Sequence, residues 1–408
     1  AIQFDNAFID GTGSARVIEM TDKPGTNLND VEPSGGITLV VETSTTADIS
    51  DNSSISHSQA ITAGGFKAFS YEVESGATLT VSHDAGQAGT VTGQGSVSAS
   101  GMGDVVVTEL GNNSEGGGSV TVDDDFSAFD SVGGVVFERT DGWSEIIDLD
   151  GTLPSTSLDF VQGSGATEGA TFNLVDSFPS GGTSTTIGLK SGGTDAPIQI
   201  VLTAAQASTQ TISRDDSSGA GTTETLVTEL ASTLDTKLGD ISTDLKLDLT
   251  SGDAVLTSSA TIGDVNLDVT GGVNGTPRTL DVSALTTNFG VTSTKTTTVE
   301  SYNTLKLTAT QADGLALAGS GAVVIEELSG DQATDLSSVA TGLDVTVEVD
   351  GNSDITTNAN ITNAEVDTYE VADGAELTLT AAQADGVSIT ATGTGTTKVT
   401  DIASTLGA

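Results

Sequence analysis

Apolar and polar residues alternate along many short segments of the chain, with the period of two that is typical of half-buried β-strands. Residues 245–249 read Leu-Lys-Leu-Asp-Leu, and residues 343–349 read Leu-Asp-Val-Thr-Val-Glu-Val. Residues 37–42, Ile-Thr-Leu-Val-Val-Glu, form a further expected strand between turn-rich segments. Short strands separated by turns about every eight to twelve residues predict an all-β fold.

One phrase recurs along the chain. Residues 377–386 read Leu-Thr-Leu-Thr-Ala-Ala-Gln-Ala-Asp-Gly; related copies lie at residues 305–314 and 200–207, and residues 71–80 repeat the start of the last copy, at 369–378. Within the last copy, the sequence predicts that Thr380 caps one helical turn, which Gly386 ends in a left-handed conformation. Repeated units of this kind stack on one another to bury a shared core.

A second repeated spacing supports a stacked arrangement. Leu230 is followed by leucines at 238 and 245, and Leu328 is followed at the same spacing by leucines at 336 and 343. Identical spacing predicts identical backbone geometry in the two places. A β-solenoid is the preferred architecture, because stacked coils suit short strands and plentiful Ser, Thr and Asn; a row of tandem β-sandwich modules is the alternative.

The repeats predict six segments. These are an N-terminal cap or assembly segment (1–70), a first β-repeat (71–134), an irregular β-module or decayed copy (135–197), second and third β-repeats (198–298 and 299–368), and an incomplete terminal repeat (369–408).

Charge then narrows the classes of function. The chain has 57 acidic and 12 basic residues, for a formal net charge of -45. Such a surface repels nucleic acid and anionic membranes, which are bound through clustered Lys and Arg. The chain has no cysteine for a disulfide or thiolate metal site. It also has no apolar run of the length that crosses a bilayer, so neither nucleic-acid binding nor membrane insertion is expected.

The sequence does not favour an enzyme. Nucleophilic catalysis needs a positioned base, usually histidine, and the two histidines, His57 and His83, occur in no recognisable catalytic motif. Acid pairs occur throughout so acidic a chain, and only 4% of residues are aromatic, which does not suit a sugar-cleaving cleft.

Calcium binding is the better chemical hypothesis. Asp350, Asn352 and Asp354 place three oxygen-bearing side chains at alternate positions, like the start of a calcium loop. The match is partial, because Ile355 stands where that loop has Gly and Ile361 where it has Glu. Further candidate ligands for Ca²⁺ are Asp123, Asp125, Asp148, Asp150, Asp313 and Asp385. The competing interpretation of each is an Asp that caps a turn or faces solvent.

The phrase Leu-Thr-Ala-x-Gln-Ala-Asp-Gly, followed by an apolar strand and Gly-x-Gly, resembles repeats of very large bacterial surface proteins, including adhesins and S-layer-like proteins exported by type I systems. The resemblance covers mainly residues 71–110 and 198–408. It implies an extracellular, acidic, calcium-tolerant structural protein of the cell surface, with no catalytic residue.

The leading hypothesis is a non-enzymatic extracellular protein that self-assembles into a filament or surface layer, as a homo-polymer. The last copy breaks off after Thr405, and an unfinished β-repeat leaves an open edge that the N-terminal segment of another subunit can cover by strand addition. The first alternative is an adhesin or ligand-binding module of a larger surface protein, with a carbohydrate or cell-surface ligand. The second is a structural protein of a phage or virus.

Overall fold

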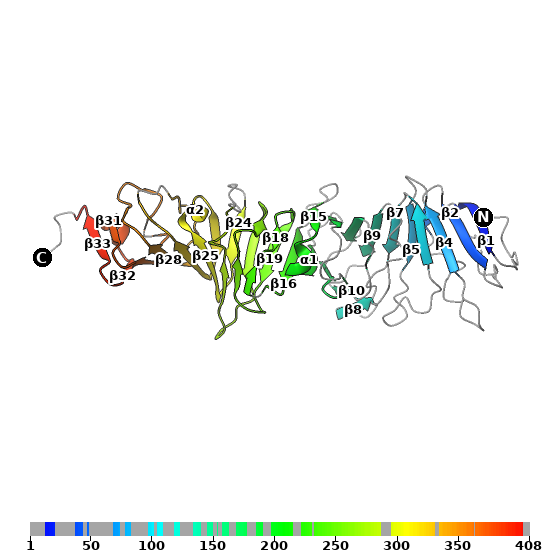
Figure 1. Cartoon of the computed structure of the whole chain (residues 1–408), viewed down its shortest axis with the longest axis horizontal. Coiled ribbons are helices and arrows are strands. Elements are labelled where there is room, and N and C mark those ends of the chain that lie inside the picture. The colour runs from blue at the N-terminus through cyan, green and yellow to red at the C-terminus, as the bar shows by residue number, and fades with distance from the viewer. Residues whose placement is uncertain are drawn as a thin grey trace. The chain divides into compact units, whose positions relative to one another are not determined.

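Figure 1 shows the strands and short helices of the computed structural model. The chain divides into two compact units. Unit 1 comprises residues 1–202 and 209–224, and unit 2 comprises residues 203–208 and 225–408. The structure describes residues 153, 157–162, 169–177, 185–190, 197–214, 222–230, 232–286, 295–330, 334–362 and 364–402, and before these the strands β1 to β10, for which few side chains are described.

Unit 1 contains three groups of hydrogen-bonded strands. The first group is β1 (Gly13–Met20), β2 (Ile37–Thr43), β4 (Ala68–Val73) and β6 (Val97–Gly101). The second is β3 (Ala47–Asp48), β5 (Thr78–Ser82), β7 (Asp104–Thr108), β9 (Gly134–Arg139), β11 (Ser157–Gln162), β13 (Thr186–Lys190) and β15 (Thr211–Arg214). The third is β8 (Gly118–Val122), β10 (Glu145–Leu149), β12 (Ala170–Asn173) and β14 (Ile198–Thr203).

Unit 2 contains three main sheets, here named I, II and III. Sheet I is β16 (Thr223–Thr228), β19 (Asp244–Asp248), β22 (Leu267–Thr270), β24 (Thr296–Val299) and β26 (Ala316–Gly319). Sheet II is β17 (Ser232–Leu234), β20 (Ala254–Leu256), β23 (Arg278–Asp281), β25 (Asn303–Thr308), β27 (Ala322–Glu326), β28 (Asp344–Val349), β30 (Thr368–Val371) and β32 (Ser388–Ala391). Sheet III is β29 (Ser353–Asp354), β31 (Glu376–Thr380) and β33 (Thr396–Thr400), and β18 (Lys237–Leu238) pairs with β21 (Thr261–Ile262).

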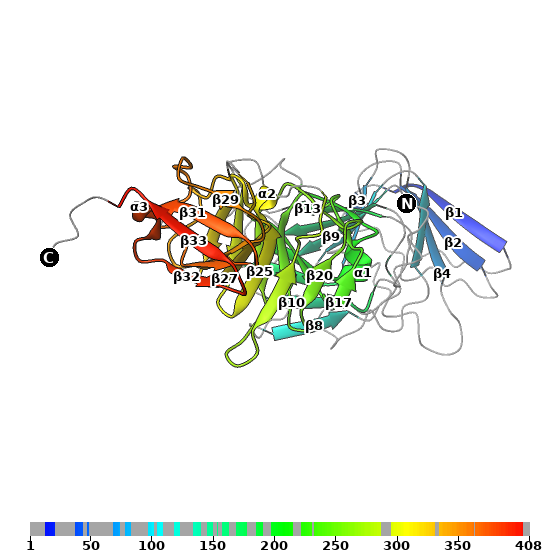
Figure 2. The same ribbon diagram turned by 60° about the vertical axis from the view of Figure 1, so that its left-hand side comes forward.

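Neighbouring strands in these sheets are parallel, and each belongs to the next coil of the chain. Leu305 on β25 pairs with Val323 on β27, 18 residues later, whereas Leu267 on β22 pairs with Thr297 on β24, 30 residues later. Coils of unequal length therefore stack with their strands aligned, and Figure 2 shows the strands lying side by side. This arrangement confirms the predicted all-β solenoid rather than a row of sandwiches.

The core lies inside the coils, because one residue in two along each strand points inward. Buried and partly exposed residues alternate along β16, β25 and β27. In unit 1, Phe137 and Phe160 pair in register on β9 and β11, with ring centroids 5.3 Å apart, and Phe172 lies 5.0 Å from Phe160. Parallel coils therefore continue through the part of the segment 135–197 that the structure describes.

Three single-turn helices follow strands that carry the recurring phrase. They are α1 (Ala204–Ala207), α2 (Ala309–Ala312) and α3 (Ala381–Ala384). Thr380 is the N-cap of α3, and Gly386 has a φ of 81°, as the sequence predicted. None of the helices in the described ranges has the length and apolar character needed to cross a membrane.

The sequence copies in unit 2 do not stack directly on one another. Residues 227–230, 325–328 and 399–402 are related, reading Val-Thr-Glu-Leu, Ile-Glu-Glu-Leu and Val-Thr-Asp-Ile. Their first residues lie on β16, β27 and β33, which belong to sheets I, II and III. The related segments therefore lie on different sheets, because the number of residues between them does not correspond to a whole number of coils. Hydrogen-bonded strands of successive coils consequently pair residues that are not at equivalent positions in the sequence copies.

Candidate functional site

The recurring phrase forms a capping box at each single-turn helix. In α3, the Thr380 hydroxyl accepts a hydrogen bond from the Gln383 backbone N–H at 3.2 Å, and Gln383 Oε1 accepts one from the Thr380 backbone N–H at 2.9 Å. The same reciprocal pair joins Thr308 and Gln311 in α2. A capping box satisfies two N–H groups that a helix start leaves unpaired.

The glutamine of this box also binds the preceding coil. Gln383 Nε2 donates to the carbonyl oxygens of Ile355, Asn358 and Ile361, at 2.9, 3.0 and 3.1 Å. Gln311 Nε2 donates to Val282 and Leu285, at 2.8 and 3.0 Å. Because both glutamines are buried, these bonds satisfy carbonyl groups that water does not reach, and they join one coil to the next.

The coil that receives the glutamine turns at a second short motif. At 248–250, 281–283, 335–337 and 354–356 the turn consists of Asp, a buried apolar residue, then Ser or Thr; the same residue types also occur on strands, at 268–270 and 344–346. In each turn, the carboxylate accepts from the backbone N–H and the hydroxyl of the residue two positions later. The sequence analysis did not identify these turns. Spacing alone does not distinguish them, because the same residue types occur on strands.

These hydrogen bonds favour the ionised carboxylate. Bonds from the Ser337 hydroxyl and backbone N–H hold the pKa of Asp335 below its usual value of 3.8. Thr356 lowers the pKa of Asp354 in the same way, and Thr394, on the next coil, lowers that of Asp373. The described turns therefore use acidic side chains as hydrogen-bond acceptors for the main chain.

The three residues of the predicted calcium loop have separate partners. Asp350 accepts from the Glu327 backbone N–H at 3.1 Å, and Asn352 accepts from that of Glu376 at 3.0 Å, whereas Asp354 binds Thr356. The first two partners lie on different neighbouring coils. All three side chains are exposed, and buried residues alternate with them along this segment.

Of the remaining candidate ligands, the structure describes the side chains of Asp313 and Asp385. Asp313 accepts from the Asp335 backbone N–H at 2.7 Å, and Asp385 is the exposed C-cap of α3. Asp148 lies on β10, where its side chain is not described, and Asp123, Asp125 and Asp150 lie outside the described residues. Where side chains are described, no group of three or more His, Cys, Asp or Glu residues is placed to hold a metal. His57 and His83 are also outside the described residues.

A row of glutamates runs across sheet II. The register of β27, β28 and β30 places Glu348 beside Glu326 on one side and Glu370 on the other. Partial burial raises the pKa of Glu348, and the charges of Glu326, Asp350 and Glu370 raise it further, against the opposing effect of Lys306. Lys306 itself forms an ion pair of 2.5 Å with Glu326.

Sheets II and III each end in a strand with one free edge. Among the described residues, β32 pairs only with β30 and β33 only with β31. Leu377 and Leu379 on β31 are buried, but their register partners on β33, Thr397 and Val399, are exposed, Val399 at 36%. Among the described residues, the inward-facing positions of this coil are therefore more exposed than those of the earlier coils.

A corner with a left-handed backbone conformation occurs at three related positions. Glu229, Glu327 and Asp401 have left-handed backbone conformations, with φ of 58°, 62° and 54°, and each precedes an apolar residue. The predicted identity of backbone geometry at Leu230 and Leu328 is thus confirmed at this corner. Leu230 and Leu328 are 0% and 1% exposed, whereas the corresponding Ile402 is 59% exposed. Ile402 therefore lies at a position equivalent to those of two core residues, Leu230 and Leu328, but its side chain is exposed in the part of the chain that the structure describes.

Comparisons with known proteins gave no relatives: no family model matches the chain, and no curated protein and no solved structure is similar to it.

Proposed function

We propose that this chain is a non-enzymatic structural protein that self-assembles into a filament or surface layer by strand addition between subunits. The observation that supports this proposal is the uncovered coil at β32 and β33, with Ile402 exposed where Leu230 and Leu328 are buried. A free strand edge with an apolar row beside it is a template for another parallel strand, and natural proteins normally cover such edges.

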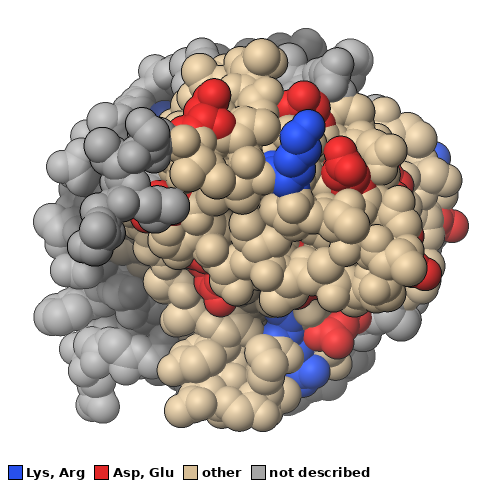
Figure 3. All heavy atoms as spheres, turned by 90° about the vertical axis from the view of Figure 1, so that its left-hand side faces the viewer, with Lys and Arg blue, Asp and Glu red and all other residues tan. Residues whose placement is uncertain are grey.

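In this proposal the occupant of the edge is a second copy of the chain; in the alternative, an adhesin or ligand-binding module of a larger surface protein, the occupant is a further repeat of the same protein. The strand β1 is the edge strand of its sheet, pairs only with β2 among the described strands, and runs parallel to it. Its free edge offers the same parallel geometry that β32 and β33 require. Figure 3 shows that the face at the C-terminal end of Figure 1 consists largely of uncharged residues, with acidic side chains set apart from one another.

Substitution of Ile402 tests the proposal. Ile402→Asp places a charge in the edge without removing a buried side chain, so it should leave the fold intact and prevent assembly. Val255→Asp is the matched control, because Val255 is 37% exposed on β20, which is paired on both sides. Sedimentation velocity over a range of protein concentrations should show polymers for the wild type and the control, and monomers for Ile402→Asp. Equal polymerisation of all three proteins would refute the edge as the assembly site.

An extracellular location at the cell surface is part of the proposal. Its support is the resemblance of the recurring phrase to bacterial surface repeats and the acidic composition, which salt-rich surroundings screen. Fractionation of the producing cells should find the protein outside the membrane. A structural protein of a phage or virus is the alternative, and the protein would then be recovered in purified particles.

Calcium binding is a separate proposal, which concerns the candidate ligands named from the sequence: Asp123, Asp125, Asp148, Asp150, Asp313, Asp350, Asn352, Asp354 and Asp385. A cation bound only by the folded state stabilises it by mass action. Removal of calcium with a chelator should lower the melting temperature, and the loss should be recovered with calcium. A melting temperature that does not change on chelation would contradict calcium binding.

A further inference from the structure

The short hairpin that follows β22 has an asparagine and a glycine at its tip. Residues 273–276 read Val-Asn-Gly-Thr, and Asn is followed by Gly nowhere else in the chain. Val273 and Thr276 bond to each other through both backbone N–H groups, at 3.2 and 2.8 Å, so Asn274 and Gly275 form the turn. Gly275 has a φ of 85°, which glycine adopts without strain. Residues 273–277 are all exposed, so water reaches the whole tip.

The main-chain nitrogen of Gly275 is not engaged in a hydrogen bond. Neither Asn274 nor Gly275 bonds to any group in the part of the chain that the structure describes. Glycine also has no side chain to obstruct its nitrogen, and the space where a β-carbon would stand is open to 4 Å. Gly314, which follows Asp313, differs in this respect, because its N–H donates to the Asp335 carbonyl oxygen at 2.8 Å. The nitrogen beside Asn274 is therefore accessible as a nucleophile.

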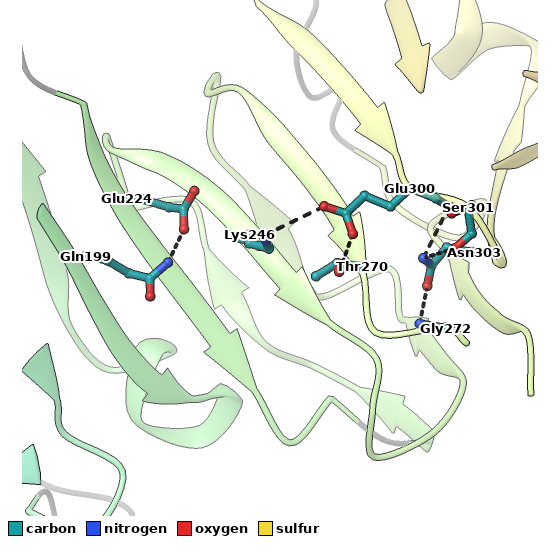
Figure 4. A network of polar contacts seen from close by, with 8 residues as sticks. All are labelled: Gln199, Glu224, Lys246, Thr270, Gly272, Glu300, Ser301 and Asn303. Carbon is teal, nitrogen blue, oxygen red and sulfur yellow. Dashed lines mark hydrogen bonds and ion pairs between the residues drawn. The ribbon is translucent and has the colours of Figure 1, made fainter. Parts of the chain in front are cut away.

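The base of the hairpin is fixed on both sides. The Gly272 N–H donates to Asn303 Oδ1 at 2.8 Å, as Figure 4 shows. After the hairpin, the Arg278 N–H donates to the Tyr302 carbonyl oxygen at 3.0 Å. A change of main-chain conformation at the tip is consequently confined to the exposed residues between these two points, and the coil stays folded.

The other described asparagines are protected by hydrogen bonds or by the residue that follows. Asn303 is buried, and its amide bonds three main-chain groups. Asn360 is exposed, but the next residue is Ile361, whose branched side chain is 1% exposed and hinders approach to its nitrogen. Hydrogen bonds also hold the side chains of Asn173, Asn266, Asn352 and Asn358. Among the described asparagines, Asn274 alone combines exposure, an unbonded amide and a following glycine.

We propose that Asn274 is a site of spontaneous deamidation through a cyclic imide. Asparagine is among the residues that limit the chemical stability of proteins. The Gly275 main-chain nitrogen attacks Asn274 Cγ and loses its proton, and the side-chain nitrogen leaves as ammonia. Water then adds to either carbonyl of the imide, which opens to aspartate or to isoaspartate. The product adds one negative charge to a chain whose net charge is -45, and isoaspartate lengthens the turn by the β-carbon.

Peptide mapping by mass spectrometry tests this assignment, and the test does not depend on assembly. The folded full chain is incubated at mildly alkaline pH and digested at mildly acidic pH, where the reaction is slow. A synthetic peptide of residues 270–280, incubated alongside, reacts without the restraint of the hairpin. The folded protein should convert at Asn274 no more than about tenfold more slowly than the peptide, which corresponds to about 1.4 kcal/mol for opening the hairpin. An isoaspartate methyltransferase should label the product, and the melting temperature should not change.

Two variants make the result specific. Gly275→Asp introduces a residue that tolerates left-handed backbone and fits the open space, but its side chain hinders the nitrogen. It should slow conversion at Asn274 by at least about tenfold, equivalent to about 1.4 kcal/mol. Asn274→Gln should remove the methyltransferase label from the hairpin, because glutamine closes a larger ring far more slowly. The proposal is overturned if Asn274 keeps its amide beyond that limit, if Gly275→Asp converts at the wild-type rate, or if Asn303 or Asn360 converts before Asn274.

Discussion

The side chain of Gln383 hydrogen-bonds four main-chain groups, one in its own coil and three in the preceding one. Its replacement by Ala would leave buried carbonyl groups without donors, and each such group costs free energy. We expect Gln383→Ala to lower the free energy of unfolding by about 3 kcal/mol. Chemical denaturation monitored by circular dichroism measures the change.

The neighbouring Ala382 provides the control for this prediction. Ala382 is exposed in the same helical turn, so Ala382→Gln adds an amide that does not reach the preceding coil. It should change the free energy of unfolding by less than about 0.5 kcal/mol. An equal loss in both variants would show that the helical turn, rather than the bond between coils, determines the effect.

Tyr369 is a buried residue whose polar atom is unsatisfied. Tyr369 is 0% exposed, its hydroxyl has no hydrogen-bond partner among the residues that the structure describes, and burial raises the pKa of this phenol well above its usual value. Removing the hydroxyl removes a desolvation cost, so Tyr369→Phe should raise the free energy of unfolding by about 1 kcal/mol. Tyr302→Phe is the control, because the Tyr302 side chain is half exposed and its hydroxyl is not needed for the fold. A destabilised Tyr369→Phe variant would contradict this account.

At the scale of single elements, the sequence predicted the helix cap and the turn after it. It did not predict which groups on other coils form hydrogen bonds with them. The cap at Thr380 and the left-handed Gly386 follow from neighbouring residue types. The carbonyl groups that Gln383 binds are 22 to 28 residues earlier, so no local pattern identifies them. The same holds for Asp350 and Asn352, whose hydrogen-bond partners Glu327 and Glu376 lie 23 residues earlier and 24 residues later.

The row of glutamates on β27, β28 and β30 predicts a dependence of stability on pH. The pKa of Glu348 is raised above its usual value of 4.5, so the folded state binds this proton more readily than the unfolded state. The contribution of Glu348 to the free energy of unfolding therefore increases as the pH falls from neutral toward 4.5. Glu348→Gln should raise the melting temperature at pH 7, and the difference from the wild type should disappear below the usual pKa.

Melting curves over this pH range, in low salt, measure the effect. Glu376→Gln is the control, since Glu376 is an exposed acid on β31, outside the row. It should not change the melting temperature at either pH. A Glu348→Gln variant that melts below the wild type at pH 7 would mean that Lys306 stabilises the glutamate charge more than its acidic neighbours destabilise it.

At the scale of the whole molecule, the sequence predicted a solenoid but not the placement of its repeats. Alternation and turn spacing were sufficient for the fold, because they follow from the two faces of each strand. The coil from Leu305 to Val323 has 18 residues, whereas the coil from Leu267 to Thr297 has 30. This difference in coil length determines the sheet on which each copy lies. The stacking order of coils, rather than sequence similarity, determines which residues meet.

Assembly by strand addition also has a consequence at this scale. Each added subunit would continue the stack of parallel strands, so the strands would run across the filament and successive coils would follow along it. The spacing between hydrogen-bonded strands is about 4.8 Å.

X-ray diffraction from aligned assemblies of the full chain is the most direct test of this central claim. We predict a reflection at about 4.8 Å along the filament axis, absent from Ile402→Asp preparations treated in the same way. Filaments whose 4.8 Å reflection lies across the axis, or a wild-type protein that stays monomeric at every concentration, would contradict assembly through the edges of β32 and β33.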